Sequence, residues 1–145
     1  MIYTNSDGGS RGNPGPGAIG VVLREDDQIL QQYAEVMRGD VTNNVAEYTG
    51  LIRALEIAAR YTKEEITCVL DSELIVKQLL GEYQVKNSTL LKLFLRVQKL
   101  QEKFEKITYK YVSREDPFQK KADYLLNLAL DKKFGPRRVK KEKKK

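Results

Sequence analysis

The sequence predicts an α/β fold in which a mixed five-stranded sheet is flanked by about four helices. Residues 2–37 hold three segments in which apolar and polar residues alternate, the pattern of half-buried strands. Residues 44–132 then alternate apolar stripes at helical spacing with two strand-like runs. A helix that connects two strands returns the chain to the same end of the sheet, so these later strands are expected to pair in parallel. We therefore expect three antiparallel strands first and parallel additions after them.

The first three strands are predicted to form an antiparallel meander. A strand at 2–6 precedes a run at 7–17 that is rich in glycine and proline, which we interpret as a turn. Apolar residues alternate over 19–23 and mark the second strand. A turn at 26–27 leads to a third strand at 28–37.

The second half of the chain alternates helices and strands. In chain order we expect a helix, a buried strand, two helices, a strand and a last helix, at residues 44–61, 66–70, 72–80, 90–104, 107–111 and 118–132. The strand at 66–70 is continuously apolar, as expected of a strand that is buried on both faces. Gly81 suits the position just after the C-terminus of the short helix.

The composition excludes several kinds of chemistry. The 145 residues are 41% hydrophobic and 32% charged, the balance of a globular domain large enough to bury a core. No run resembles a membrane span or a signal peptide, so we expect no membrane partner. The chain has no histidine, which excludes Ser-His-Asp and Cys-His catalysis and imidazole metal ligands. The single cysteine, Cys68, is expected in the core and is compatible with a reducing cytoplasm. We also expect a monomer.

The formal charge of +6 is concentrated at the C-terminus. Residues 132–145 carry nine Lys and Arg and one acid, which is +8, so residues 1–131 carry −2. We interpret 1–131 as the folded domain and 132–145 as a flexible basic tail. Such a tail either solubilises the chain or binds phosphates regardless of sequence, because neutralised phosphates release counterions. The second interpretation is preferred if the folded domain acts on nucleic acid.

Four acidic residues each have an ordinary local explanation. Asp7 precedes two glycines and suits an Asx turn. Glu47 stands three residues after Asn44, as in a capping box with Asn44 as the N-cap. Asp71 suits a cap of the next helix, and Asp123 suits the positive end of the last helix.

Placed on the predicted topology, the same four acids converge. Asp7 and Asp71 each close a strand, while Glu47 and Asp123 occupy the first turns of helices at the same edge of the sheet. Clustered carboxylates raise one another's pKa values, so such a cluster requires cations. Oxygen ligands without nitrogen or sulfur suit Mg²⁺, with Mn²⁺ as a substitute. Two such ions ~4 Å apart can activate a water and stabilise the leaving oxygen of an in-line displacement.

Four short blocks of the sequence carry a family resemblance. They are YTNSDGGSRGNPGPG at 3–17, TNNVAEY at 42–48, LDS at 70–72 and KADYL at 121–125. In order and spacing they resemble the four signature blocks of type 1 ribonuclease H, and the likeness covers about residues 2–131. The resemblance implies a ribonuclease H-like fold and an endoribonuclease that cuts the RNA strand of RNA/DNA hybrids, leaving 5′-phosphate ends.

The resemblance also implies a role for each acid. Asp7 would bridge two metal ions. Glu47 and Asp71 would complete one ion's site, and Asp123 would serve the other, where the attacking water is positioned. Further residues fall where the family contacts its substrate, chiefly in the minor groove: Gly8, Ser10, Asn13, Asn43, Asn44 and Ser72. For Asn43 and Asn44 helix capping is the structural alternative.

Two departures from the family pattern modify this expectation. Many relatives carry a histidine in the loop before the last acid, whereas residues 114–121 have none. Arg114, Lys120 or Lys121 could replace it electrostatically, although a lysine cannot relay protons near neutral pH unless its pKa is depressed. Turnover is then expected to be slower or to favour higher pH. The basic protrusion of some bacterial relatives is also missing, since only residues 82–87 separate the two central helices.

Two other functions remain open at this point. The enzyme could also cut double-stranded RNA, because both duplexes present a wide, shallow minor groove and the cut strand carries the same 2′-hydroxyls. A non-catalytic nucleic-acid-binding module on the same fold is the alternative from a different class. The intact acidic set argues against the second alternative, because uncompensated negative charge would repel phosphates.

Overall fold

Nine elements follow one another along residues 1–136, the part of the chain that this computed structural model describes. In chain order they are β1 (Ile2–Ser10), β2 (Gly15–Glu25), β3 (Gln28–Val41), α1 (Asn43–Ala58), β4 (Glu65–Leu70), α2 (Glu73–Leu79), α3 (Ser88–Gln101), β5 (Lys106–Tyr111) and α4 (Pro117–Phe134). Residues 132–134, which the charge pattern places in the tail, are therefore helical. The remaining tail residues 137–145 lie outside the described residues.

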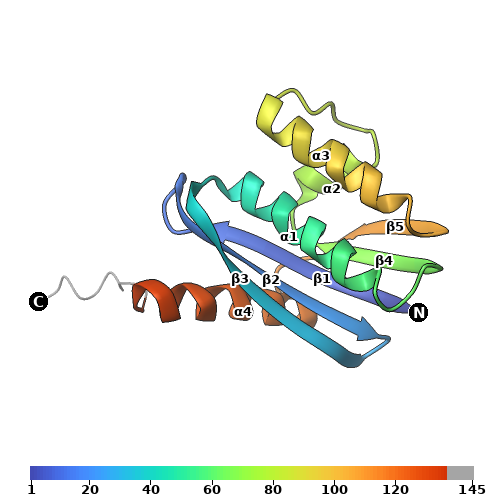
Figure 1. Ribbon diagram of the computed structural model, residues 1–145, viewed down its shortest axis with the longest axis horizontal. Coiled ribbons are helices and arrows are strands. Elements are labelled where there is room, and N and C mark those ends of the chain that lie inside the picture. The colour runs from blue at the N-terminus through green and yellow to red at the C-terminus, as the bar shows by residue number, and fades with distance from the viewer. Residues whose placement is uncertain (137–145) are drawn as a thin grey trace, which may run out of the picture.

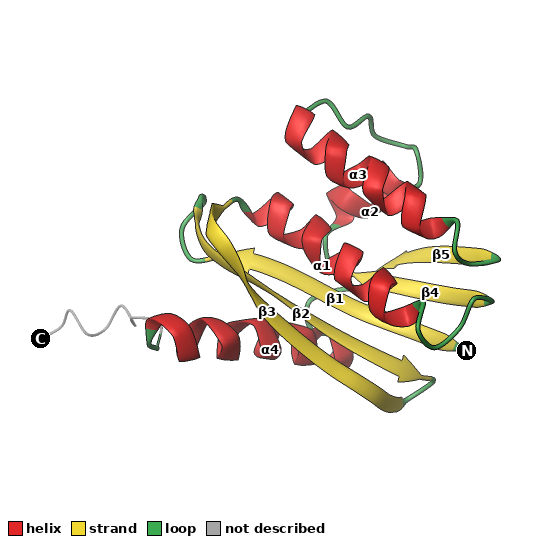
Figure 2. Cartoon of the chain, viewed as in Figure 1, coloured by secondary structure: helices red, strands yellow, loops and turns green. Residues whose placement is uncertain are grey.

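The five strands form one mixed sheet in the order β3-β2-β1-β4-β5. β1 lies at the centre, antiparallel to β2 and parallel to β4, and β5 continues the sheet in parallel to β4. α1 covers one face of the sheet and α4 the other, while α2 and α3 lie on the α1 side (Figure 1). The colouring by element in Figure 2 makes the three layers easy to follow. This architecture confirms the expected mixed sheet with four flanking helices.

Alternate residues of β2 serve the two faces of the sheet. Ile19 and Val21 belong to the larger core cluster, which α1 covers. Ala18 belongs to a smaller cluster with Leu126 and Leu130 of α4. The central strands are therefore buried on both sides, and their ends are the places where side chains from both helix layers can meet.

β1 is longer than the sequence pattern indicates. The expected turn at 7–17 is wrong, because β1 continues to Ser10 and pairs with β2 as far as Gly17. The glycines of residues 7–17 therefore serve close packing against a helix as well as the turn of the chain. A Cβ on Gly8 would overlap the backbone carbonyl oxygen of Ala46, so glycine allows α1 to lie directly against the strand.

The remaining elements are present with shifted ends. β3 continues to Val41, beyond the expected residue 37, and α1 ends at Ala58 before a short turn. α3 spans 88–101, and Phe104 lies in the turn that follows it, where its side chain is still buried. Cys68 is fully buried in the larger core cluster, as expected.

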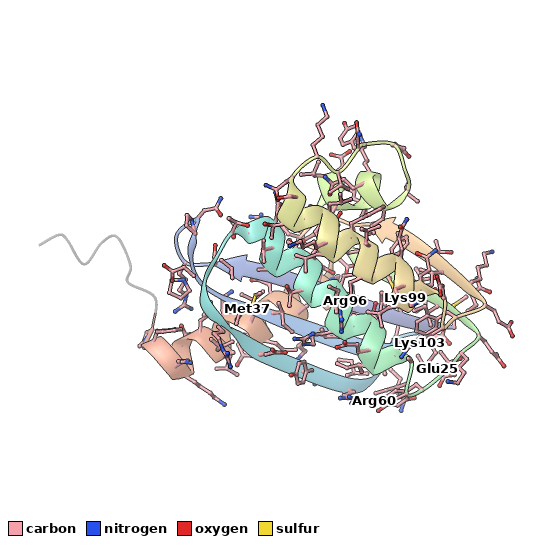
Figure 3. The ribbon with its side chains drawn as sticks, turned by 45° about the horizontal axis from the view of Figure 1, so that its top comes forward. Glu25, Met37, Arg60, Arg96, Lys99 and Lys103 are labelled. Atoms are coloured by element: carbon pink, nitrogen blue, oxygen red, sulfur yellow. The ribbon has the colours of Figure 1, made fainter. Side chains whose placement is uncertain are left out.

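Ion pairs connect α1 to its neighbours on the outer surface. Arg53 of α1 contacts Glu35 of β3 at 2.8 Å, and Arg96 of α3 contacts Glu56 of α1 at 2.9 Å. Figure 3 shows Arg96 on this face together with Arg60, Lys99 and Lys103. Within the described residues, no helix combines the length and the apolar character that crossing a bilayer requires.

Candidate metal-binding cleft

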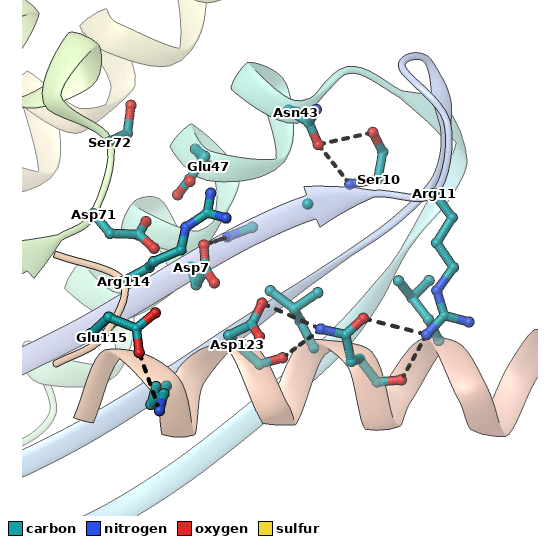
Figure 4. A pocket seen from close by; sticks show the side chains of 16 residues that line it. Asp7, Ser10, Arg11, Asn43, Glu47, Asp71, Ser72, Arg114, Glu115 and Asp123 are labelled. Carbon is teal, nitrogen blue, oxygen red and sulfur yellow. Dashed lines mark hydrogen bonds and ion pairs between the residues drawn. The ribbon is translucent and has the colours of Figure 1, made fainter. Parts of the chain in front are cut away.

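The four predicted acids line one cleft of about 610 Å³ (Figure 4). Asp71 directly follows β4, but Asp7 lies within β1, so its expected position at a strand end is wrong. β1 and β4 pair in parallel up to Asn5 and Val69, and continuing that register by two residues sets Asp7 level with Asp71. Asp7 therefore lies on the part of β1 that extends past the end of β4.

The other two acids come from the helices on opposite faces of the sheet. Glu47 and Asp123 lie in the second turns of α1 and α4, one turn further along than expected. The contact between α1 and Gly8 occurs at the residue before Glu47. On the other face, a Cβ on Gly20 would overlap the backbone carbonyl oxygen of Ala122, the residue before Asp123.

Gly20 is thus a positioning residue that sequence reasoning missed. It pairs with Asp7 across β1 and β2. Gly8 follows Asp7 in the chain and Gly20 lies opposite it in the sheet. These two glycines let α1 and α4 approach the two faces of the sheet at the level of Asp7. Glu47 and Asp123 reach Asp7 because the helix backbones can pack directly against the strands at these glycines.

Three of the acids are close enough to share a cation. One carboxylate oxygen each of Asp7, Glu47 and Asp71 lies within 4.8 Å of the other two. Asp123 is not part of this trio, but it lines the same cleft, and its charge helps to raise the pKa of Asp7. Asp7 is only 6% exposed, whereas Asp123 is an exposed side chain of α4.

Burial and mutual repulsion raise the pKa values of the three acids in this cluster. Burial, followed by the charges of Asp71 and Asp123, raises the pKa of Asp7 to about 8. Burial and the charge of Asp7 raise the pKa of Glu47 well above its ordinary value. Burial also raises the pKa of Asp71, and the positive charge of Arg114 opposes that rise. In the absence of cations the cluster therefore retains protons near neutral pH.

The residues present fit a hard divalent cation. Oε1 of Glu47 is buried and has no hydrogen-bond partner among the described residues. A buried polar atom in that state is costly unless something else satisfies it. The nearby donor atoms are all carboxylate oxygens, the ligands that Mg²⁺ and Mn²⁺ prefer.

Most of the local explanations for the acids do not apply. The N-cap of α1 is Thr42, whose side chain accepts a hydrogen bond from the backbone N–H of Val45, so Asn44 is not the cap. Ser72 caps α2 and Asp116 caps α4. Asp7 makes no such Asx turn either, because it lies within β1 and its Oδ1 accepts a hydrogen bond of 2.9 Å from the N–H of the next residue, Gly8.

The residues expected to contact substrate divide between two hollows. Gly8, Ser10, Asn43 and Ser72 line the acidic cleft. Asn13 and Asn44 instead line a second hollow of about 550 Å³, bounded by the β1–β2 loop, the end of β3 and the starts of α1 and α3.

Asn43 connects the two hollows. Its Oδ1 accepts hydrogen bonds from the backbone N–H of Ser10 at 2.9 Å and from the Ser10 hydroxyl at 3.1 Å. Its own backbone N–H donates to Oδ1 of Asn13 at 3.0 Å. These bonds fix the β1–β2 loop against the start of α1, and they are a structural role that helix capping does not describe.

The three basic residues of the loop before α4 are placed differently. Arg114 lines the cleft and lies near Asp71 (Figure 4). Lys120 also lines it, but its Nζ is 3.3 Å from a carboxylate oxygen of Glu115. Lys121 is not among the residues that line the cleft.

A buried amide, also missed from the sequence, lies beneath the cleft. Gln119 is fully buried; its Nε2 donates to the backbone oxygen of Ser6 at 2.7 Å and its Oε1 accepts from Asn5 at 3.1 Å. A hydrogen bond from Gln119 also lowers the pKa of Asp71. No periodicity in the sequence signals this role, because the partners lie more than one hundred residues away.

The family model described as reverse transcriptase-like matches residues 5–129. Among solved structures, ribonuclease H1 from Halobacterium salinarum superimposes with a TM-score of 0.84 at 38% identity, covering 90% of this chain and 98% of that one. LC11-RNase H1, solved in complex with an RNA/DNA hybrid, gives a TM-score of 0.86 at 37% identity, covering 92% and 99% of the two chains.

Curated relatives extend the comparison to longer proteins. A bifunctional protein of Mycobacterium tuberculosis is 40% identical over 132 residues, which is 90% of this chain. This chain spans only 35% of that protein's length, and 64% of the length of the ribonuclease HI of Halobacterium salinarum.

Proposed function

The chain belongs to the reverse transcriptase-like, ribonuclease H-type family, and from this membership we propose that it is a metal-dependent endoribonuclease acting on the RNA strand of RNA/DNA hybrids. One observation carries the proposal. Three carboxylates from β1, α1 and the end of β4 converge within 4.8 Å, and a fourth from α4 lines the same cleft. A hybrid as substrate is supported by the related LC11-RNase H1, which was solved with one bound.

The acids divide into two proposed ion sites. Asp7 would contribute to both, Glu47 and Asp71 would complete one, and Asp123 would complete the other. Bound Mg²⁺ ions would supply positive charge to activate the attacking water and to offset the charge that develops on the leaving oxygen. Mn²⁺ is the expected substitute, because it accepts the same oxygen ligands.

The chain's own residues define how the substrate is held. The carboxylates would hold the ions at the position of the scissile phosphate, and Arg114 offers positive charge at the rim beside Asp71. Arg114 is better placed for this than Lys121, and its charge is not engaged as that of Lys120 is by Glu115. In-line attack on phosphorus breaks the bond to the 3′ oxygen, so the products carry 5′-phosphate and 3′-hydroxyl ends.

Recognition of RNA is assigned to polar groups at the mouth of the cleft. The amide oxygen of Asn43 accepts from Ser10, so the amide nitrogen is the group of Asn43 that we assign to a 2′-hydroxyl. Gly8, Ser10 and Ser72 line the same cleft, and we assign them to contacts with the cut strand. Asn13 and Asn44 line the second hollow and are assigned to the neighbouring part of the duplex.

The test is cleavage of labelled RNA/DNA, RNA/RNA and DNA/DNA duplexes with Mg²⁺, with Mn²⁺ and with a chelator. Asp7→Asn removes the central ligand, and Asp27→Asn, in the exposed turn between β2 and β3, is the matched control. We expect cation-dependent cleavage of the hybrid that Asp7→Asn abolishes and Asp27→Asn preserves. Cleavage with chelator present, or full activity of Asp7→Asn, would overturn the proposal. Equal cleavage of RNA/RNA would extend the substrate class to double-stranded RNA.

A further inference from the structure

Asp123 differs from the other three acids in how it is held. Asp7 is fixed within a central strand, and Glu47 has a buried carboxylate oxygen. Asp123 is an exposed side chain on the surface of α4. An aspartate on a helix surface has two accessible χ1 rotamers, so something must select the one that points into the cleft.

One turn further along α4, the side chain of Asn127 reaches back to Asp123. Its Nδ2 donates to the backbone oxygen of Asp123 at 3.0 Å and to the carboxylate Oδ1 at 3.3 Å. The amide is neutral, so it restrains the carboxylate without cancelling the charge that a cation requires. The Asp123 carboxylate lines the same cleft as Asp7 (Figure 4).

The Asn127 amide is itself held by a residue of the β1–β2 loop. Nη2 of Arg11, in the β1–β2 loop, donates to the side-chain oxygen of Asn127 at 3.4 Å and to its backbone oxygen at 3.3 Å. This contact orients the amide with its nitrogen towards Asp123. Figure 4 shows the resulting line of hydrogen bonds from Arg11 through one α4 side chain to Asp123.

Arg11 is held firmly enough to act as an anchor. Its guanidinium contacts Asp131 at 2.6 Å and the backbone oxygen of Gly135 at 3.3 Å, and its side chain is only 16% exposed. Asp131 neutralises the charge of Arg11. Arg11 can therefore hold Asn127 in position without opposing the binding of cations in the cleft.

We propose that Asn127 and Arg11 are positioning residues that select the Asp123 rotamer needed for the second ion site. The inference rests on the proposed function for its catalytic consequence, but the rotamer selection itself is a property of the protein alone. The line of contacts runs from Arg11 in the β1–β2 loop through Asn127 to the carboxylate of Asp123.

The first measurement does not depend on activity. In protein labelled with ¹³C and ¹⁵N, three-bond couplings to the Asp123 carboxyl carbon report its χ1 angle. We expect one rotamer in the wild type and averaging between two in Asn127→Ala, with the fold confirmed by thermal unfolding. A single unchanged rotamer in Asn127→Ala would overturn the proposal.

The second measurement uses hybrid cleavage over a Mg²⁺ series. For Asn127→Ala we expect kcat to fall about tenfold to a hundredfold, with a higher Mg²⁺ requirement and a nearly constant KM for hybrid. Lys132→Gln, at an exposed position of α4 outside this line of contacts, is the matched control and should leave kcat unchanged. Asp131→Asn loosens Arg11 but keeps the amide, so it should give a smaller loss than Asn127→Ala. An unchanged kcat in Asn127→Ala, or an equal loss in Lys132→Gln, would contradict the proposal.

The two measurements separate this inference from the proposed function. If the wild type cleaves no hybrid, the proposed function fails, and the couplings still decide whether Asn127 selects the rotamer. If Asn127→Ala is unfolded at the assay temperature, Arg11→Met supplies the same test, because it removes the anchor of the amide without touching Asp123. Unaveraged couplings in Arg11→Met would then overturn the proposal.

Discussion

Asp7 is the central acid of the cleft, and its buried position disfavours the ionised form of its carboxyl group. Burial and the neighbouring carboxylates raise its pKa to about 8, and only the N–H of Gly8 opposes this rise. A cation shared with Glu47 and Asp71 would reverse the balance, since positive charge stabilises every ionised carboxylate around it. The same residue therefore links metal binding, protonation and folding stability.

This link predicts that, without divalent cations, stability falls as the pH rises. The pKa of Asp7 is raised from 3.8 to about 8 in the folded chain, so the folded chain keeps a proton that the unfolded chain releases. The stability due to this proton is fully present below about pH 4 and is lost as the pH rises through about 8. Thermal unfolding in chelator at a series of pH values measures the loss.

Asp7→Asn is the control for that experiment, because asparagine does not titrate. Its Tm should decline less steeply over the same pH range, and added Mg²⁺ should raise the Tm of the wild type more than that of the variant. Parallel Tm curves for the two proteins would show that Asp7 is not the group responsible.

At the scale of elements, α1 and α4 pack on opposite faces of the sheet and place Glu47 and Asp123 in the same cleft. Gly8 allows α1 to lie against β1, and Gly20 allows α4 to lie against β2. The helix positions, and with them Glu47 and Asp123, depend on the absence of these two Cβ atoms. Close packing of backbones is thus part of the construction of the site.

Gly20→Ala should therefore destabilise the protein and impair cleavage. The new Cβ would overlap the carbonyl oxygen of Ala122, so α4 must shift, at a cost of about 1–3 kcal/mol in the free energy of unfolding. Gly9→Ala is the matched control for stability, because its Cβ would meet its nearest neighbours at an ordinary 3.9 Å. Urea unfolding of both variants measures the difference, and equal stabilities would contradict the packing argument.

The order and type of the elements could be predicted from the sequence, because helical and strand periodicities are local and strong here. The end of β1 could not, since its glycines resemble a turn and only their contacts with α1 and β2 show them to be strand residues. The N-cap of α1 was misplaced for a similar reason. Thr42 and Asn44 both have capping side chains, and backbone geometry decides between them.

The sequence predicted the acids of the site but not the residues that position them. The sequence blocks indicated the four acids, which line one cleft as expected. Gly20, Gln119 and Asn127 carry no sequence signal of comparable strength, because each acts through a tertiary contact. Only the four-residue spacing of Asp123 and Asn127 on a helix could have suggested one of these contacts.

At the scale of the whole molecule, the charge is divided between a nearly neutral domain and a basic C-terminus. Residues 1–131 carry −2, and Lys132 and Lys133 at the end of α4 bring the described residues 1–136 to a formal charge of zero, although the cleft itself is acidic. The backbone oxygen of Gly135 accepts a hydrogen bond from Arg11, which lines the cleft, so the last described residues lie at the Arg11 end of the cleft. This placement favours a phosphate-binding role for the basic C-terminal segment.

Deleting residues 136–145, which hold seven basic residues and one acid, tests that role. We expect a higher KM for hybrid and a weaker dependence of binding on salt, with kcat little changed, because fewer counterions are released on binding. Binding measured over a salt series gives both quantities. Unchanged binding at every salt concentration would mean that the segment does not contact the substrate.

The central claim is that Asp7, Glu47, Asp71 and Asp123 act as one site, and single-turnover cleavage of a hybrid in Mg²⁺ tests it most directly. Each acid is replaced by its amide, singly, and Asp7→Asn is also combined with Asp123→Asn. We predict losses of ~10²-fold or more for each single variant and little further loss in the double variant, because residues that act as a unit are not additive. A full rate in any single variant, or losses that multiply in the double variant, would contradict the claim.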